Sequence, residues 1–129
     1  MSDSTIGESL DLRIDPVDRR LAVVAVDGTI DGTNAPRLKQ CISKALAAGP
    51  RLIVVDLSHC DFIDSTALAV LVAARLRLQG TGRLVLAAGD HGTGATLRTA
   101  GIDRTVDLFA DRGEAVAALR GSDGALAAP

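Results

Sequence analysis

The sequence predicts a single domain of the α/β or α+β class, with a small mixed sheet and helices. The chain has 129 residues, of which 47% are hydrophobic, and this suits one compact domain. Apolar runs rich in Val, Leu and Ile at residues 21–26, 52–57 and 83–88 are typical of buried strands. Segments with helical periodicity lie between these runs, so the strands are expected to pair in parallel through crossover connections.

The chain is expected to begin with a β-hairpin. Residues 10–14, LDLRI, alternate apolar and polar side chains as a half-buried strand does. The segment Asp15-Pro16-Val17-Asp18 has the residues that turns favour, and the run LAVVAV at 21–26 then forms a more buried strand.

The first helix is expected to follow the loop DGTIDGTN. Thr33 or Asn34 can cap its first amide groups, and Pro36 suits its first turn. Apolar residues at helical spacing then form one buried stripe, made of Leu38, Cys41, Ile42, Ala45 and Leu46. Gly49-Pro50 ends the helix.

The remaining elements alternate between strands and helices. They are expected at residues 52–57 (strand), 65–79 (helix), 83–88 (strand), 93–101 (short helix) and 111–119 (helix). Residues 1–8 and 121–129 are expected to be flexible, which leaves a domain at residues 9–120.

Composition argues against several classes of function. The net charge is −2, the basic residues are scattered and aromatics make up 2% of the chain, so direct binding to nucleic acid is disfavoured. No apolar run is long enough to cross a membrane, and residues 1–10 do not form a secretory signal. Cys41 and Cys60 each lie in apolar surroundings and are expected to be free thiols. A cytoplasmic protein is therefore expected.

Asp64-Ser65-Thr66 stands directly before one of the most apolar segments of the chain. Asp64 or Ser65 can serve simply as the cap of a helix. The free amide groups and partial positive charge of a helix start can also accommodate a phosphate, so a phosphorylated Ser65 would change the local charge without breaking the fold. The residues alone leave both interpretations open.

The helix after Ser65 carries no charge between Ala67 and Ala74. One stripe of larger side chains is expected to face the sheet, and it consists of Leu68, Leu71, Val72 and Leu76. Ala69, Val70 and Ala73 lie on a different side, which is either a docking surface or a face covered by another element.

The chain contains three informative segments, VVDLSHCDFIDSTALAVLVAA, GTIDGTNAPRLKQ and LRTAGIDRTVDLF followed by EAVAAL. Together they resemble STAS domains, specifically the anti-sigma factor antagonists of bacteria. The segment VVDLSHCDFIDSTALAVLVAA resembles the family's signature, in which a strand leads through Asp-Ser into a helix. GTIDGTNAPRLKQ resembles the family's GELDxxTAPxL motif, and LRTAGIDRTVDLF with EAVAAL resembles its C-terminal pattern. The resemblance covers roughly residues 10–119 in the family's order.

The resemblance implies an α/β STAS fold, with a small mixed sheet of about four to five strands flanked by about four helices. It also implies a phosphorylation switch at Ser65, with Asp31 as an acidic neighbour. Unphosphorylated, such a protein binds an anti-sigma factor that is a serine kinase, and it frees a sigma factor. The kinase, which binds the ATP, then phosphorylates Ser65 and releases the complex, and a phosphatase resets it. The partner-binding residues are expected to be Asp31, Asp64, Ser65, Thr66, Ala69, Val70 and Ala73.

Two residues depart from the family's pattern. Ala67 replaces the usual Gly after the Ser-Thr pair, and its methyl group is expected where a kinase or phosphatase approaches. Thr29 replaces the common Glu of GELD.

No catalytic residue, metal or cofactor of its own is expected for this chain. A serine hydrolase would need a base near Ser65, for which only His59 and His91 are available, and no nucleophile-elbow motif is present. His59-Cys60-Asp61 has no second pair of ligands at zinc spacing, and the Gly-rich residues 89–96 lack the Lys of a phosphate loop.

The alternative function is a STAS scaffold subunit that belongs to a stress-signalling or lipid-transport assembly and does not switch. The intact Asp64-Ser65 pair favours the phosphorylation switch.

Overall fold

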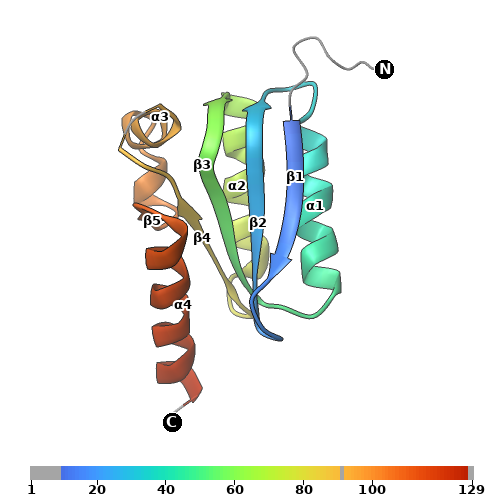
Figure 1. Cartoon of the computed structure of the whole chain (residues 1–129), viewed down its shortest axis with the longest axis vertical. Helices are drawn as coiled ribbons and strands as arrows, with labels where there is room; N and C mark the ends of the chain where they lie inside the picture. Colours follow the sequence, from blue (N-terminus) through green and yellow to red (C-terminus); the bar gives the residue numbers. More distant parts are fainter. Residues whose placement is uncertain (1–9, 91, 128–129) are drawn as a thin grey trace.

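The computed structural model describes residues 10–90 and 92–127. Strands and helices alternate through most of the chain (Figure 1). The strands are β1 (Leu10–Pro16), β2 (Leu21–Ile30), β3 (Leu52–Ile63), β4 (Arg83–Ala87) and β5 (Leu108–Phe109). The helices are α1 (Ala35–Ala47), α2 (Ser65–Leu78), α3 (Thr93–Thr99) and α4 (Arg112–Ala127), with a short 3₁₀ turn at Ile102–Arg104.

The five strands form one mixed sheet in the order β1-β2-β3-β4-β5. β1 and β2 form the predicted antiparallel hairpin, and the pairs β2–β3, β3–β4 and β4–β5 are parallel. The α/β class and the mixed sheet are therefore confirmed. Parallel strands all end at the same edge of the sheet, so the start of α2 lies beside the loop that leads from β2 into α1.

The sheet is covered on both faces. Helices α1 and α2 lie side by side behind it in Figure 1, and they bury the larger core with Leu38, Ile42 and Leu71 among the fully covered side chains. Helix α4 packs on β3 and β4 from the other face, where Ala115 and Leu119 join a smaller core.

Helix α2 turns most of the predicted stripe to the sheet, with one exception. Ala67, Leu71 and Leu78 are buried, and Leu68 and Val72 pack half-buried against the core. The prediction for Leu76 is wrong, because this side chain is 53% exposed. Between Ala67 and Ala74 the helix has no charged side chain to mark its outer side, so the apolar pattern alone does not show where the buried stripe ends.

Other differences concern element lengths. β3 continues from 57 to Ile63, through irregular pairing with β2, because backbone pairing does not require the apolar pattern that predicts a strand. The two-residue β5 is too short to show any pattern. The last helix was predicted at residues 111–119, and α4 runs from Arg112 to Ala127.

Some predictions fall outside the described residues. They are the flexible segment 1–8, the last two residues of the tail and the imidazole of His91.

Candidate partner-binding site at the start of helix α2

Asp64 is the N-cap of α2 and also holds a neighbouring loop. Its Oδ1 accepts a hydrogen bond from the amide of Ala67 at 3.1 Å. Its Oδ2 accepts one from the amide of Gly32 at 3.0 Å. One carboxylate therefore starts the helix and ties the β2–α1 loop to it.

The β2–α1 loop is ordered by its own side chains. Asp31 Oδ1 accepts hydrogen bonds from the amide and the hydroxyl of Thr33, at 2.9 and 2.6 Å. The buried Asn34 accepts from the amide of Asp31 and donates to the carbonyl of Thr29. Asn34 thus stands at the predicted N-cap position of α1, but its side chain braces the loop and makes no capping bond.

Asp31 is held as an anion in this loop. The hydroxyl of Thr33, followed by the amide of the same residue, lowers the pKa of the Asp31 carboxyl. The loop lies against the first turn of α2, since a Cβ atom placed on Gly32 would be 3.6 Å from Thr66 Oγ1. A fixed negative charge is therefore held one residue from the contact with α2.

Ser65 and Thr66 are both exposed at this junction. Ser65 is the first residue of α2, and its hydroxyl makes no hydrogen bond to any residue that the structure describes. Phe62, three residues earlier, is 53% exposed, which is uncommon for a large aromatic side chain. No sequence pattern indicated a role for Phe62, which lies beyond the predicted strand at residues 52–57.

A groove of about 330 Å³ continues from Thr66 along the seam between α1 and α2. Its apolar lining consists of Ile42 from α1 and Ala69, Val70, Ala73 and Ala74 from α2. Lys39 and Arg77 complete the lining. Ala69 and Ala73 are exposed and Val70 is half-buried, so three predicted binding residues share one hollow with Thr66.

The α1 side of the groove was not predicted. Ile42 was assigned to the buried stripe of its helix, and Lys39 was given no role. Which helix lies beside α2 is a tertiary contact, and helical spacing within one segment cannot reveal it.

Ala67 does not line the groove and instead faces the core. It is fully buried in the core, so its methyl group does not stand where a kinase or phosphatase approaches, and that expectation is wrong. The physical reason is its place in the stripe of Ala67, Leu71 and Leu78, which faces the sheet.

His59 belongs to a separate hollow on the sheet. That hollow, of about 160 Å³, is also lined by Asp27, Asp56 and Arg112. Within residues 10–90 and 92–127, His59 makes no hydrogen bond with Ser65, and no group of three or more His, Cys, Asp or Glu side chains is placed to hold a metal.

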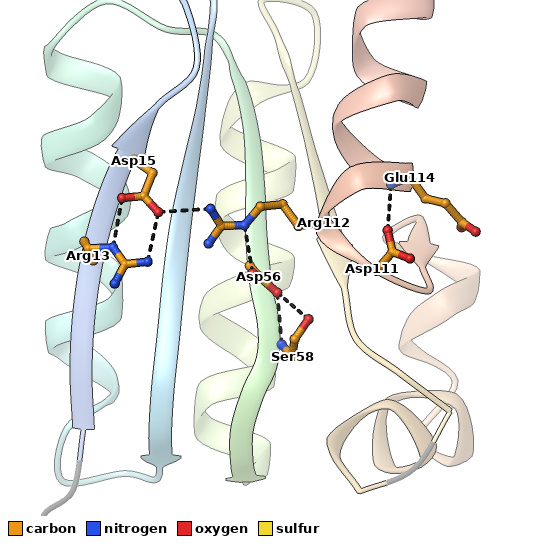
Figure 2. A network of polar contacts seen from close by, with 7 residues as sticks. All are labelled: Arg13, Asp15, Asp56, Ser58, Asp111, Arg112 and Glu114. Atoms are coloured by element: carbon orange, nitrogen blue, oxygen red, sulfur yellow. Dashed lines mark hydrogen bonds and ion pairs between the residues drawn. The ribbon is translucent and has the colours of Figure 1, made fainter.

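Figure 2 shows the polar network beside that hollow. Arg112, the first residue of α4, bridges two carboxylates on different strands. Its Nε lies 3.0 Å from Asp56 Oδ2, and its Nη1 lies 3.0 Å from Asp15 Oδ2. Asp56 also accepts hydrogen bonds from the amide and hydroxyl of Ser58. This network fastens α4 to β1 and β3.

The Gly-rich segment after β4 has a packing explanation. A Cβ atom on Gly94 would lie 1.6 Å from the carbonyl oxygen of Gly89, so only glycine fits there. The hydroxyl of Thr93 donates to the carbonyl of Cys60 at 2.6 Å.

The two cysteines are free. Cys60 is buried and Cys41 half-buried, and burial raises the pKa of both thiols. No helix within the described part of the chain has the length and apolar character needed to span a membrane.

Comparisons with known proteins agree with this architecture. A family model described as STAS domain matches residues 13–115. The anti-sigma-F factor antagonist RsfB of Mycobacterium tuberculosis is 29% identical over 101 residues, which are 78% of this chain and 83% of that protein. The crystal structure of an anti-sigma factor antagonist from Mycobacterium paratuberculosis is 30% identical, with a TM-score of 0.80, and the match covers 87% of this chain and 95% of that one.

A more distant solved structure shares the fold. The anti-sigma factor antagonist SpoIIAA in its unphosphorylated form is 21% identical with a TM-score of 0.69, and the match covers 86% of this chain and 97% of that one. The chain belongs to the STAS domain family and, within it, to the group of the anti-sigma factor antagonists.

Proposed function

We propose that this protein is a binding switch that, without phosphate on Ser65, binds an anti-sigma factor and thereby frees a sigma factor. The observation that carries the proposal is the position of Ser65. Ser65 is exposed at the capped start of α2, three residues after the exposed Phe62 and directly before Thr66, which lines the α1–α2 groove. Modification at this residue changes the charge of the docking surface without touching the core.

The physical basis of the switch is electrostatic. A phosphoserine carries a charge of about −1.5 to −2, and the free amides of a helix start accommodate it. Asp31 and Asp64 already place two carboxylates at this junction, so phosphate makes a negative region more negative. A partner that covers Ser65 would have to desolvate that charge, at a cost of about 3 kcal/mol or more.

The anti-sigma factor is proposed to be the kinase that modifies Ser65. Phosphoryl transfer forms a bond between Ser65 Oγ and the γ-phosphorus of ATP, breaks the bond to the β-phosphate oxygen and releases ADP. The base that takes the hydroxyl proton is expected from the kinase, which also holds the ATP and Mg²⁺. A separate phosphatase would remove the phosphate.

Affinity capture from the native host tests this function. The unmodified protein is used as bait in an extract of the host cells. It is expected to recover a small protein with an ATPase-type kinase fold. Bait carrying Ser65→Asp should recover much less of it. Equal recovery of a large assembly by both baits, with no kinase present, would instead support the scaffold function.

A further inference from the structure

We infer that the α1–α2 groove receives an acidic amphipathic segment of the anti-sigma factor, with Lys39 and Arg77 as the residues that recognise its carboxylates. This inference rests on the proposed function and specifies the chemistry of the partner at that site. It joins three observations, which are the apolar lining of the groove, the charges along it and the position of Ser65.

The shape and lining favour a protein segment as the occupant. The groove is open along the seam of two helices and is lined by small aliphatic side chains, with Ile42 on the α1 side. Aliphatic grooves of this kind accept the apolar side of a helix or an extended peptide. Polar small molecules need convergent hydrogen-bonding groups, and the groove offers few of these beyond the Thr66 hydroxyl and the two cations.

The charges along the groove are both positive. Lys39 is exposed and has no ion pair with any described residue. Arg77 donates to the hydroxyl of Ser43 at 2.9 Å, but within the described chain no carboxylate lies within ion-pair distance of it. Two cations without carboxylate partners beside an apolar lining are complementary to a segment that carries both apolar and acidic side chains.

The position of Ser65 connects this recognition to the switch. Thr66 lines the groove and Ser65 precedes it, while Arg77 lies eleven residues further along α2, roughly 16 Å away by helical rise. The carboxylates of an acidic segment in the groove would therefore pair with Lys39 and Arg77. One end of the segment would lie close to a phosphate on Ser65. Phosphate and segment repel each other, so phosphorylation would oppose the same interaction that the cations favour.

The two lysines of the chain provide a matched test. Both lie on α1 and both are exposed, but Lys39 lines the groove and Lys44 does not. The affinity of the anti-sigma factor recovered by capture is measured by titration calorimetry against wild type, Lys39→Glu and Lys44→Glu. Lys39→Glu is expected to weaken binding about tenfold, since it replaces an attraction by a repulsion, and Lys44→Glu should change it less than about twofold. A higher salt concentration should reduce the difference in binding affinity between Lys39→Glu and Lys44→Glu.

The outcomes separate this inference from the function on which it rests. If wild type binds the anti-sigma factor and the two lysine variants bind equally well, the acidic-segment inference is overturned and the proposed function stands. If Lys39→Glu binds more tightly than wild type, the segment is basic and the inference is again overturned. If wild type binds no anti-sigma factor, the proposed function fails and this inference fails with it. Thermal unfolding of each variant verifies that both remain folded.

Discussion

Replacing Ser65 by Asp is expected to weaken binding of the anti-sigma factor about 100-fold. Ser65 is exposed at the first position of α2, where a carboxylate is compatible with the helix start, so the fold should be retained. In the complex, that charge has to be desolvated beside Asp31 and Asp64, and a cost of about 3 kcal/mol corresponds to roughly two orders of magnitude in the dissociation constant.

The neutral control for this experiment is Ser65→Asn, which has nearly the shape of Asp without its charge. It is expected to bind within about threefold of wild type. Titration calorimetry of the three proteins with the same anti-sigma factor separates charge from bulk. If Ser65→Asp and Ser65→Asn weaken binding equally, the larger side chain and not its charge prevents binding. That result would contradict the electrostatic switch.

Replacing Arg112 by Met is expected to lower the free energy of unfolding by about 2–3 kcal/mol. The side chain of Asp56 is only 7% exposed, and Arg112 is its ion-pair partner. Without the guanidinium, a nearly buried carboxylate keeps only its hydrogen bonds from Ser58. Methionine retains the apolar stem, so the change isolates the charge. Urea denaturation measures the effect.

Arg120→Met on the same helix is the matched control. Arg120 pairs with Asp18 at 3.1 Å, but both side chains are about half exposed, so its loss should cost less than about 1 kcal/mol. If the two variants lose the same amount of stability, the network of Figure 2 does not fasten α4 as described.

The same network predicts how stability depends on pH. Burial acts to raise the pKa of Asp56, but hydrogen bonds from Ser58 and the contact with Arg112 outweigh it and leave the pKa lowered. The pKa of Asp15 is lowered chiefly by its hydrogen bond with Arg13. Carboxyls with lowered pKa in the folded state contribute stability above about pH 4, and this contribution is lost as the pH falls further. In Arg112→Met, the arginine no longer offsets the effect of burial on the pKa of Asp56. The loss of stability on acidification should therefore begin at higher pH than in wild type.

Much of the fold follows from local sequence pattern. The hairpin, the parallel strands and helices α1 and α2 were predictable because each has its own apolar period and its own start or stop residues, such as Pro36 and Gly49. Asp64 as a cap was predictable for the same reason, since capping depends on residues within one turn.

What the sequence could not reveal depends on contacts between distant residues. The pairing of Arg112 with Asp56 and Asp15 spans 56 and 97 residues, and no local pattern indicates it. The same is true of the α1 side of the groove, where Ile42 and Lys39 meet α2. The burial of Ala67 and the exposure of Leu76 were missed because the uncharged segment from Ala67 to Ala74 does not mark its outer side in the sequence.

The direct test of the switch is phosphate transfer within the complex itself. The complex of this protein with the captured anti-sigma factor is incubated with ATP and Mg²⁺, and phosphate is mapped by mass spectrometry while dissociation is followed in parallel. Wild type is expected to gain one phosphate on Ser65 and to leave the complex, while Ser65→Ala gains none and stays bound. Phosphate on Thr66 instead of Ser65, or release of Ser65→Ala at the wild-type rate, would contradict the account.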